Sequence, residues 1–161
     1  MLAVAWLLVF AGIYWYFDNW YQQQHNPNPQ SVLESQAGEV VLKRNRAGHY
    51  VADGSINGHK VTFLLDTGAT QVALSTSLAR QLGLAAGARV QVQTANGPAL
   101  GYQSKLNGVR LGSIEVHNVS ALITDGMEGS NVLLGMSFLK QLEFTQRGDS
   151  LILHRLTRPN T

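Results

Sequence analysis

The sequence predicts an all-β domain, and three observations support that prediction. From about residue 39 onward, short apolar runs alternate with turn-forming residues. Asn-Gly pairs at 57–58 and 96–97 lie between such runs, where they favour tight hairpins. No stretch of this part places a helical pattern of about 10–15 residues between two strand patterns. The pattern is therefore typical of a β-barrel or sandwich with short helices, and not of a doubly wound parallel sheet.

The predicted elements follow one another closely. A first short helix is expected from Ser75, because Ser and Thr cap helix N-termini, and it should stop at Gly83. A second is expected after Gly135, within 136–144. The predicted strands lie at 39–45, 48–56, 59–65, 89–106 (with a turn at Asn96-Gly97-Pro98), 110–124, 131–134 and 149–156.

The N-terminal residues differ from the rest. Residues 1–21 carry no charge before Asp18, and as a helix this apolar run is about 26 Å long, close to the roughly 30 Å of a bilayer core. Aromatic residues crowd its C-terminal end, as in an interfacial belt. We therefore predict a transmembrane anchor. A cleaved signal peptide is the alternative, but the segment has neither a basic start nor a small-x-small cleavage site.

The anchor sets the predicted domain organisation. Residues 22–38 are rich in Gln, Asn, Ser and Pro and are predicted to be a polar linker, followed by the folded domain at 39–161. No Lys or Arg occurs between Asp18 and Glu39. Because positive charge holds flanking segments in the cytoplasm, its absence favours a single-pass protein with the domain on the extracytoplasmic, periplasmic side.

Composition excludes several kinds of chemistry. The 161 residues include no cysteine, so disulfides, thiolate catalysis and Cys-ligated metals are ruled out. The histidines show no HExxH spacing, Ser137 does not lie in a G-x-S-x-G motif, and there is no Gly-rich phosphate loop. We expect no metal and no cofactor. The net charge is +2, and the cluster Lys43-Arg44-Arg46 lies on a predicted edge strand, so nucleic-acid binding is not expected.

Residues 59–75, "HKVTFLLDTGATQVALS", contain the most informative acid. Asp66 stands between two apolar runs, where a carboxylate costs several kcal/mol unless it is paired or hydrogen-bonded. Two carboxylates in contact can share a proton, activate water and protonate a leaving amide nitrogen. The other acids considered, Asp53, Asp125, Glu128 and Asp149, lie in predicted solvated turns. The simplest second carboxylate is therefore Asp66 of another copy of the chain, placed across a two-fold axis.

A later segment repeats the design of this one. Residues 131–144 also run from an apolar strand through a glycine-containing break into a helical pattern. The second segment has Gly135-Met136 where the first has Asp66-Thr67-Gly68. One copy therefore carries an acid and the other does not.

These segments resemble a known family. "FLLDTGAT" at 63–70 resembles the active-site strand of aspartic proteases of the pepsin and retropepsin clan, and "NVLLGMSFL" at 131–139 resembles its later hydrophobic-hydrophobic-Gly element. Between them, "VQTANGPALGY" at 92–102 occupies the place of the flap hairpin. The match covers roughly residues 39–157, and with the predicted anchor the chain is most similar to bacterial single-domain, membrane-anchored retropepsin-like proteases.

The resemblance implies a retropepsin-like acid-protease barrel and a role for each matching residue. Asp66 would be the catalytic aspartate of a homodimeric endopeptidase that cleaves peptide or protein substrates. Thr67, Gly68 and Gly135 would support the active-site loops. Asn96, Gly97 and Pro98 would form the flap over an extended substrate. The terminal strands that join the retroviral dimer are not recognisable at 151–161.

A second interpretation belongs to another functional class. The same fold could persist as a membrane-tethered peptide-binding or scaffold domain that has no catalytic activity. A monomer that needs a different partner chain is a third interpretation. The observation that separates them is whether two chains bring their Asp66 carboxylates within hydrogen-bonding reach.

Overall fold

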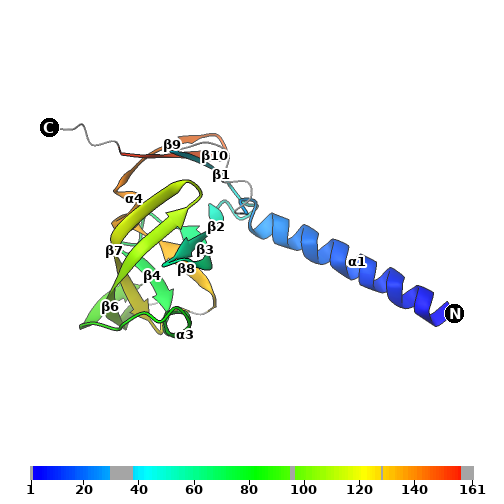
Figure 1. The fold of residues 1–161 in the computed structure, drawn as a ribbon, viewed down its shortest axis with the longest axis horizontal. Helices are drawn as coiled ribbons and strands as arrows, with labels where there is room; N and C mark the ends of the chain where they lie inside the picture. Colours follow the sequence, from blue (N-terminus) through cyan, green and yellow to red (C-terminus); the bar gives the residue numbers. More distant parts are fainter. Residues whose placement is uncertain (1, 30–37, 95–96, 128, 157–161) are drawn as a thin grey trace.

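The computed structural model describes residues 2–29, 38–94, 97–127 and 129–156, and it shows a β-rich domain from which one long helix projects (Figure 1). The helices are α1 (Leu2–His25), α3 (Thr76–Gln81) and α4 (Met136–Leu139). The strands are β1 (Glu39–Lys43), β2 (Val51–Ile56), β3 (His59–Leu65), β4 (Val72–Ser75), β5 (Arg89–Thr94), β6 (Gly97–Leu111), β7 (Ile114–Thr124), β8 (Asn131–Leu134), β9 (Leu142–Arg147) and β10 (Ser150–Arg155).

The larger sheet closes on itself as a barrel. Its strand order is β2-β3-β8-β4-β7-β6-β5, and an additional pairing between β2 and β6 closes a ring of the first six of these strands. Strand β5, at the far end, pairs only with β6 and lies outside the ring. Most neighbours are antiparallel, but β3 pairs with β8, and β4 with β7, in parallel. The predicted all-β barrel is therefore confirmed. The largest fully buried side chains include Phe63, Phe138, Leu74, Leu106, Leu111 and Leu134.

The predicted turn chemistry explains both hairpins. Asn57 and Gly58 join β2 to β3 with φ values of 50° and 83°, the left-handed conformations that a tight hairpin turn requires. Strands β5 and β6 pair from Arg89 with Tyr102 up to Thr94 with Gly97, so the second hairpin is also confirmed. Asn96, which was predicted at its tip, lies outside the described residues.

The first short helix also forms as predicted. The Ser75 hydroxyl accepts a hydrogen bond from the Leu78 N–H and caps the N-terminus of α3. Gly83, just past the end of α3, has a φ of 63°, which ends the helix.

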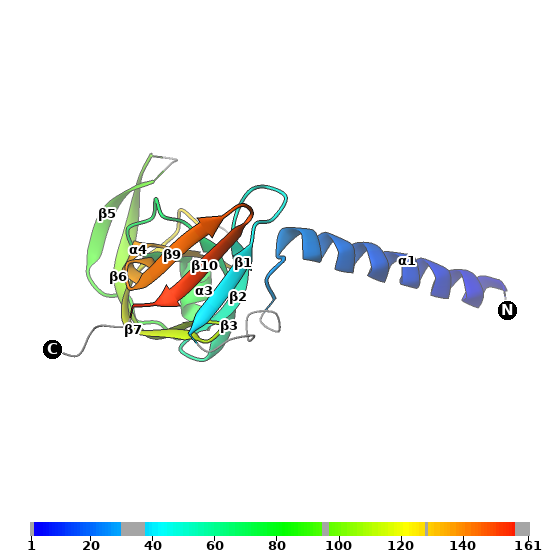
Figure 2. The same cartoon turned by 90° about the horizontal axis from the view of Figure 1, so that it is seen from above.

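A smaller sheet, in the order β1-β10-β9, covers one end of the barrel (Figures 1 and 2). Alternate residues of β1 and β10, such as Leu42 and Leu153, are buried against the core, whereas Val41 faces outward. Strand β1 is an edge strand, as predicted. Strand β9 was not predicted, because its sequence was assigned to the helix after Gly135. That helix ends at Leu139, and the chain then folds into a hairpin with β10.

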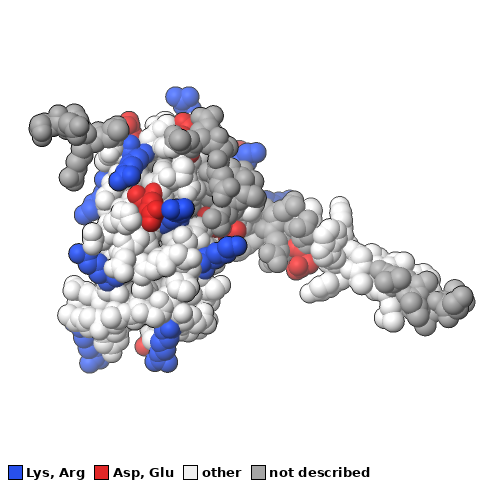
Figure 3. All heavy atoms as spheres, viewed as in Figure 1, with Lys and Arg blue, Asp and Glu red and all other residues white. Residues whose placement is uncertain are grey.

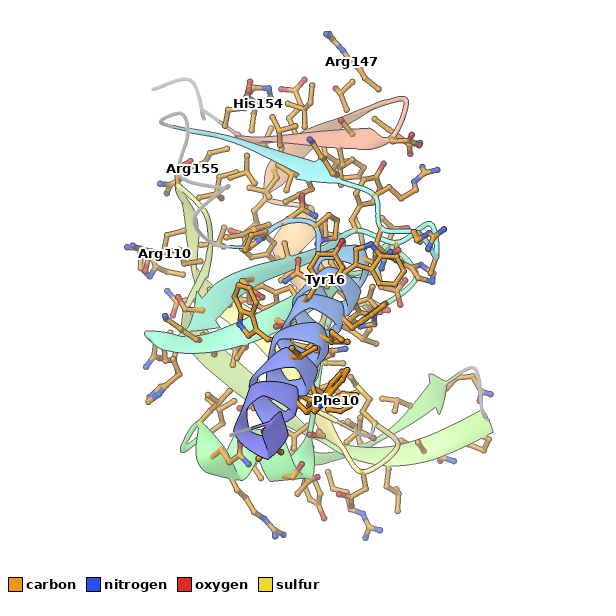
Figure 4. All side chains as sticks on the ribbon, turned by 90° about the vertical axis from the view of Figure 1, so that its right-hand side faces the viewer. Phe10, Tyr16, Arg110, Arg147, His154 and Arg155 are labelled. Atoms are coloured by element: carbon orange, nitrogen blue, oxygen red, sulfur yellow. The ribbon has the colours of Figure 1, made fainter. Side chains whose placement is uncertain are left out.

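The predicted N-terminal helix is present, but its membrane-spanning character is not supported. None of the helices within the described residues combines the length and the apolarity needed to cross a bilayer. Asp18 and the polar residues that follow end the apolar run well before the helix itself ends at His25. Aromatic side chains such as Phe10 and Tyr16 are exposed along α1 (Figure 4). The extracytoplasmic location stays a prediction.

Candidate active site

Asp66 directly follows a strand in the middle of the barrel. Strand β3 lies between β2 and β8, and its last residue, Leu65, is paired with Leu134 of β8. The Asp66 backbone N–H donates to the Leu134 carbonyl over 3.3 Å, so pairing continues up to the carboxylate. Because the two strands are parallel, the break that begins at Asp66 lies beside the break that begins at Gly135.

The Asp-Thr-Gly turn orients the carboxylate. The Gly68 N–H donates to Asp66 Oδ1 over 2.8 Å, and the Ala69 N–H donates to the Asp66 carbonyl over 3.3 Å. A carboxylate oxygen held by a backbone donor has a defined direction before any ligand arrives. Asp66 is half-buried, whereas Thr67 and Gly68 are exposed. The Thr67 side chain is therefore accessible to another molecule.

The second strand end supports the first by hydrogen bonds. Met136 N–H donates to the Ala69 carbonyl over 2.8 Å, and Ser137 N–H donates to the Thr70 carbonyl over 3.0 Å. The Ser137 hydroxyl accepts from the Val72 N–H over 3.0 Å and donates to the Ser120 carbonyl over 2.7 Å. One buried serine therefore links the active-site loop to β7.

Gly135 is needed because the two loops approach each other closely. A Cβ atom at this position would lie 2.3 Å from the Gln71 carbonyl oxygen and 2.6 Å from the Ala69 carbonyl oxygen. Backbone atoms cannot move aside as a flexible side chain can. The supporting role predicted for Gly135 therefore has a clear steric basis.

The carboxylate faces a cleft of about 680 Å³. Asp66 is the sole acidic residue that the structure describes in its lining, and the walls are otherwise apolar or neutral. The lining residues are Asp66, Gly68, Ala69, Thr70, Gln71, Ala73, Val90, Val92, Gln93, Gln103, Leu122, Thr124, Gly126, Met127 and Leu133. The cleft of one chain therefore contains one carboxylate among its described residues.

The β5–β6 hairpin forms one wall of this cleft. Val90 and Val92 of β5 and Gln103 of β6 line it. In Figure 2 the hairpin extends away from the body of the barrel. Gly97 and Pro98, predicted to be part of the flap, lie at the start of β6, where they pair with Thr94 and Gln93. Their contact with substrate stays a prediction.

Sequence reasoning missed two residues of this site. Ser137 does not lie in a nucleophile motif, and the signal that indicates its loop-bridging hydroxyl is its position two residues after Gly135. Gln71 follows the active-site turn and lines the cleft, and no hydrogen bond from the described residues reaches its buried Oε1. Asp53, predicted in a solvated turn, instead lies within β2 and accepts hydrogen bonds from Asn26 and Thr62.

Positively charged residues are not concentrated at the cleft. Lys and Arg residues are scattered over the face seen in Figure 3, and none of the residues that line the cleft is basic. The described residues include no group of three or more His, Asp or Glu placed to hold a metal ion. The arrangement can thus offer a carboxylate beside an apolar groove.

Comparisons with known proteins agree with this geometry. Residues 52–141 match the family described as "gag-polyprotein putative aspartyl protease". A crystal structure of a retropepsin-like aspartic protease from Rickettsia conorii superposes with a TM-score of 0.63 at 33 % identity, covering 74 % of this chain and 92 % of that one.

Two bacterial proteins are related in sequence. An "Uncharacterized protein in cobV 5'region" of Sinorhizobium sp is 34 % identical over 133 residues, which are 79 % of this chain and 57 % of that protein. "Uncharacterized protein RP867" of Rickettsia prowazekii is 29 % identical over 96 % of this chain and 69 % of its own length. The chain thus spans little more than half of the first relative.

The barrel, the paired strand ends and the family match together define the class. The chain belongs to the gag-polyprotein aspartyl protease family and has the retropepsin-like fold.

Proposed function

We propose that this chain is an aspartic endopeptidase whose active site forms when two copies bring their Asp66 carboxylates together. One observation supports this most strongly. Asp66 lies within the residues that match the aspartyl protease family, directly after barrel strand β3, and it is the sole carboxylate that the described residues contribute to the cleft. Two-carboxylate chemistry therefore needs an acid from another chain, and a second copy supplies the same acid by symmetry.

The chemistry follows from two like charges in contact. Two adjacent carboxylates cannot both ionise easily, so the pair holds one proton over a range of pH. The ionised member takes a proton from water as that water attacks the peptide carbonyl. The protonated member donates to the departing amide nitrogen, which leaves as an amine. The Gly68 N–H fixes the direction of one oxygen, so that little reorganisation is needed.

The cleft suits an extended peptide. Its apolar lining from β5, β7 and β8 can accept apolar side chains, and the adjoining hairpin offers a strand against which a substrate main chain can pair. Thr67 is exposed beside Asp66, where its hydroxyl can contact the second copy. This proposed mechanism uses the two carboxylates and a water molecule, and it requires neither a metal ion nor a cofactor.

The direct test compares wild type with Asp66→Asn on a library of peptides from denatured proteins. The substitution keeps size and hydrogen bonding but removes the ionisable pair, so turnover should fall by about 10²- to 10⁴-fold or more. Asp149→Asn is the matched control, because Asp149 is an exposed acid in the β9–β10 turn and should leave turnover unchanged. Wild-type cleavage should also follow a bell-shaped pH profile with its optimum on the acid side of neutral.

Two results would contradict the proposal. Equal turnover by Asp66→Asn and wild type would show that the chemistry lies elsewhere. Specific binding of extended peptides with no turnover, at any pH and at concentrations where the chain is dimeric, would favour the peptide-binding interpretation instead.

A further inference from the structure

Asn28, in the predicted linker, is buried inside the domain. The residue is only 1 % exposed, and its side chain forms hydrogen bonds with three backbone groups of two strands. Its Nδ2 donates to the carbonyls of Lys43 over 2.8 Å and Val51 over 2.7 Å, and its Oδ1 accepts from the Lys43 N–H over 2.6 Å. A buried amide with its donors and acceptor engaged is costly to replace, because each partner would be left unpaired.

The main chain beside Asn28 is also docked. Asn28 forms a parallel bridge with Ala52 of β2, and its carbonyl accepts from the Asp53 N–H over 3.1 Å. Asn26 Nδ2 donates to the Asp53 carboxylate over 2.7 Å, and Thr62 of β3 donates to the same oxygen over 3.0 Å. The segment Asn26–Asn28, here called the N-terminal clamp, is therefore docked against β2 by one isolated bridge and by side-chain hydrogen bonds.

The end of α1 is held at a neighbouring place. Asn45 Nδ2 donates to the His25 carbonyl over 3.1 Å, and Arg46 Nη1 donates to Gln24 Oε1 over 2.8 Å. These contacts are exposed, unlike those of Asn28, so they contribute less to the attachment. Figure 1 shows α1 leaving the domain at this point, close to β1 and β2.

A short series of hydrogen bonds connects the clamp to the end of β3, where Asp66 follows. Asn28 bonds to Lys43 and Val51, which flank the loop 44–50 on both sides. Within that loop Tyr50 forms a bridge with Arg44, and its carbonyl accepts from the Leu65 N–H over 3.0 Å. Leu65 is the residue before Asp66. Loss of the clamp would remove side-chain hydrogen bonds at both ends of the loop that supports this backbone, and would leave those ends to the pairing of Lys43 with Ser150 and of Val51 with Leu64.

We propose that the N-terminal clamp is part of the catalytic domain, and that Asn28 is a positioning residue which holds the Tyr50–Leu65 contact and so the backbone of Asp66. The docking stands on its own, whereas the effect on turnover rests on the proposed function. The catalytic domain accordingly begins near Asn26 and not at residue 39. It follows that α1 is attached to the barrel by buried hydrogen bonds as well as by the chain that leads to β1.

The first experiment cuts the full chain after the clamp. A recognition site for a sequence-specific protease is placed between residues 31 and 36, the folded protein is cut, and the fragments are separated by size under native conditions. The N-terminal fragment should stay with the barrel in the wild type and be released in Asn28→Ala. Gln24→Ala, which removes only an exposed contact of α1, is the control and should retain the fragment.

The second experiment measures what Asn28 does to the strand end in the uncut chain. In Asn28→Ala, and in Asn28→Asp, which keeps the shape but loses both donors, amide exchange at Leu65 should be about tenfold faster or more. The exchange rates of amides in the paired strands β4 and β7 should rise only as much as the change in global stability accounts for. Turnover should show a lower kcat with an unchanged KM, because no residue that lines the cleft is altered.

Each outcome decides a separate part. Release of the fragment from the cut wild type would overturn the docking. If the cut wild type retains the fragment but both Asn28 variants show unchanged amide exchange at Leu65 and unchanged kcat, the positioning role would be overturned. If the fragment and exchange results are as expected but wild type cleaves no peptide, the clamp stands and the proposed function fails.

Discussion

Two strand ends of the barrel share one design but have opposite environments. At the end of β3 the chain turns through Asp66-Thr67-Gly68, with two exposed residues and a half-buried carboxylate beside a cleft. At the parallel end of β8 it turns through Gly135-Met136-Ser137, where the glycine and the serine are buried. The end of β3 exposes the Asp66 carboxylate to the cleft. The end of β8 is buried and holds the β3 end in place by hydrogen bonds.

The difference shows why the strand-break-helix pattern alone does not define a site. The acid-bearing loop is held by hydrogen bonds with its counterpart: the N–H groups of Met136 and Ser137 donate to the carbonyls of Ala69 and Thr70. The Val72 N–H in turn donates to the Ser137 hydroxyl. Substitutions at the β8 end should therefore reduce stability first and activity as a consequence. Substitutions at the β3 end should reduce activity with little change in stability.

The largest expected effect on stability is that of Gly135→Ala. The new methyl would lie 2.3 Å and 2.6 Å from two backbone carbonyl oxygens, so one of the loops must be displaced. We expect the free energy of unfolding to fall by about 3 kcal/mol or more. Denaturant unfolding followed by circular dichroism would measure it.

Gly68→Ala is the matched variant at the other strand end. Its methyl would lie 3.1 Å from Asp66 Oδ1, and among the described residues beyond its two chain neighbours only Asp66 has atoms within 4 Å. Stability should fall by about 1 kcal/mol or less, whereas turnover should drop because the carboxylate must shift. Equal destabilisation by the two alanines would show that the strand ends do not differ as described.

Ser137→Ala should have an intermediate effect. It removes the acceptor of the Val72 N–H and the donor to the Ser120 carbonyl, and both groups are left without that partner in the interior. A loss of about 1–3 kcal/mol is expected from thermal or denaturant unfolding. A neutral result would mean that the serine does not join the loop to β7.

The smallest expected effect lies away from both strand ends. Arg110 donates a hydrogen bond over 2.7 Å to Glu115, and this bond is the main reason that the pKa of Glu115 lies below its usual value of 4.5. A lowered folded-state pKa stabilises the protein above the unfolded pKa, and this contribution disappears as the pH falls through the folded pKa.

Because both side chains are well exposed, Glu115→Gln should cost less than about 0.5 kcal/mol at pH 7. The difference between the variant and wild type should vanish when unfolding is measured at acid pH. A cost of several kcal/mol would indicate that this surface has a structural role as large as that of the β8 strand end.

Much of this arrangement was predictable, because it depends on local signals. The Asn57-Gly58 turn, the Ser75 cap and the strand before Asp66 are each encoded within a few residues. The smaller sheet was harder to predict from the sequence, because Leu142 and Phe144 continue an apolar pattern that fits a helix as well as a strand. Only the pairing of β9 with β10 decides between them.

The residues around the N-terminal clamp could not be predicted from local sequence. Asn26 and Asn28 lie in a stretch whose composition is typical of a linker, and Asp53 lies in an Ala-Asp-Gly-Ser sequence typical of a turn. Their hydrogen bonds join residues more than a dozen positions apart, so no local sequence pattern predicts these bonds. The apolar character of residues 1–17 is likewise a local signal, and the helices of the described residues do not support the membrane span that it predicts.

The central claim is that two chains share one active site, and mixing chains tests it most directly. Wild type is combined with an excess of Asp66→Asn chains under conditions where dimers exchange, and peptide turnover per wild-type chain is measured. With a threefold excess and random pairing, only about a quarter of the wild-type chains meet a wild-type partner, so turnover should fall to about a quarter. Mixed dimers that form and cleave as fast as wild type would contradict the shared carboxylate pair.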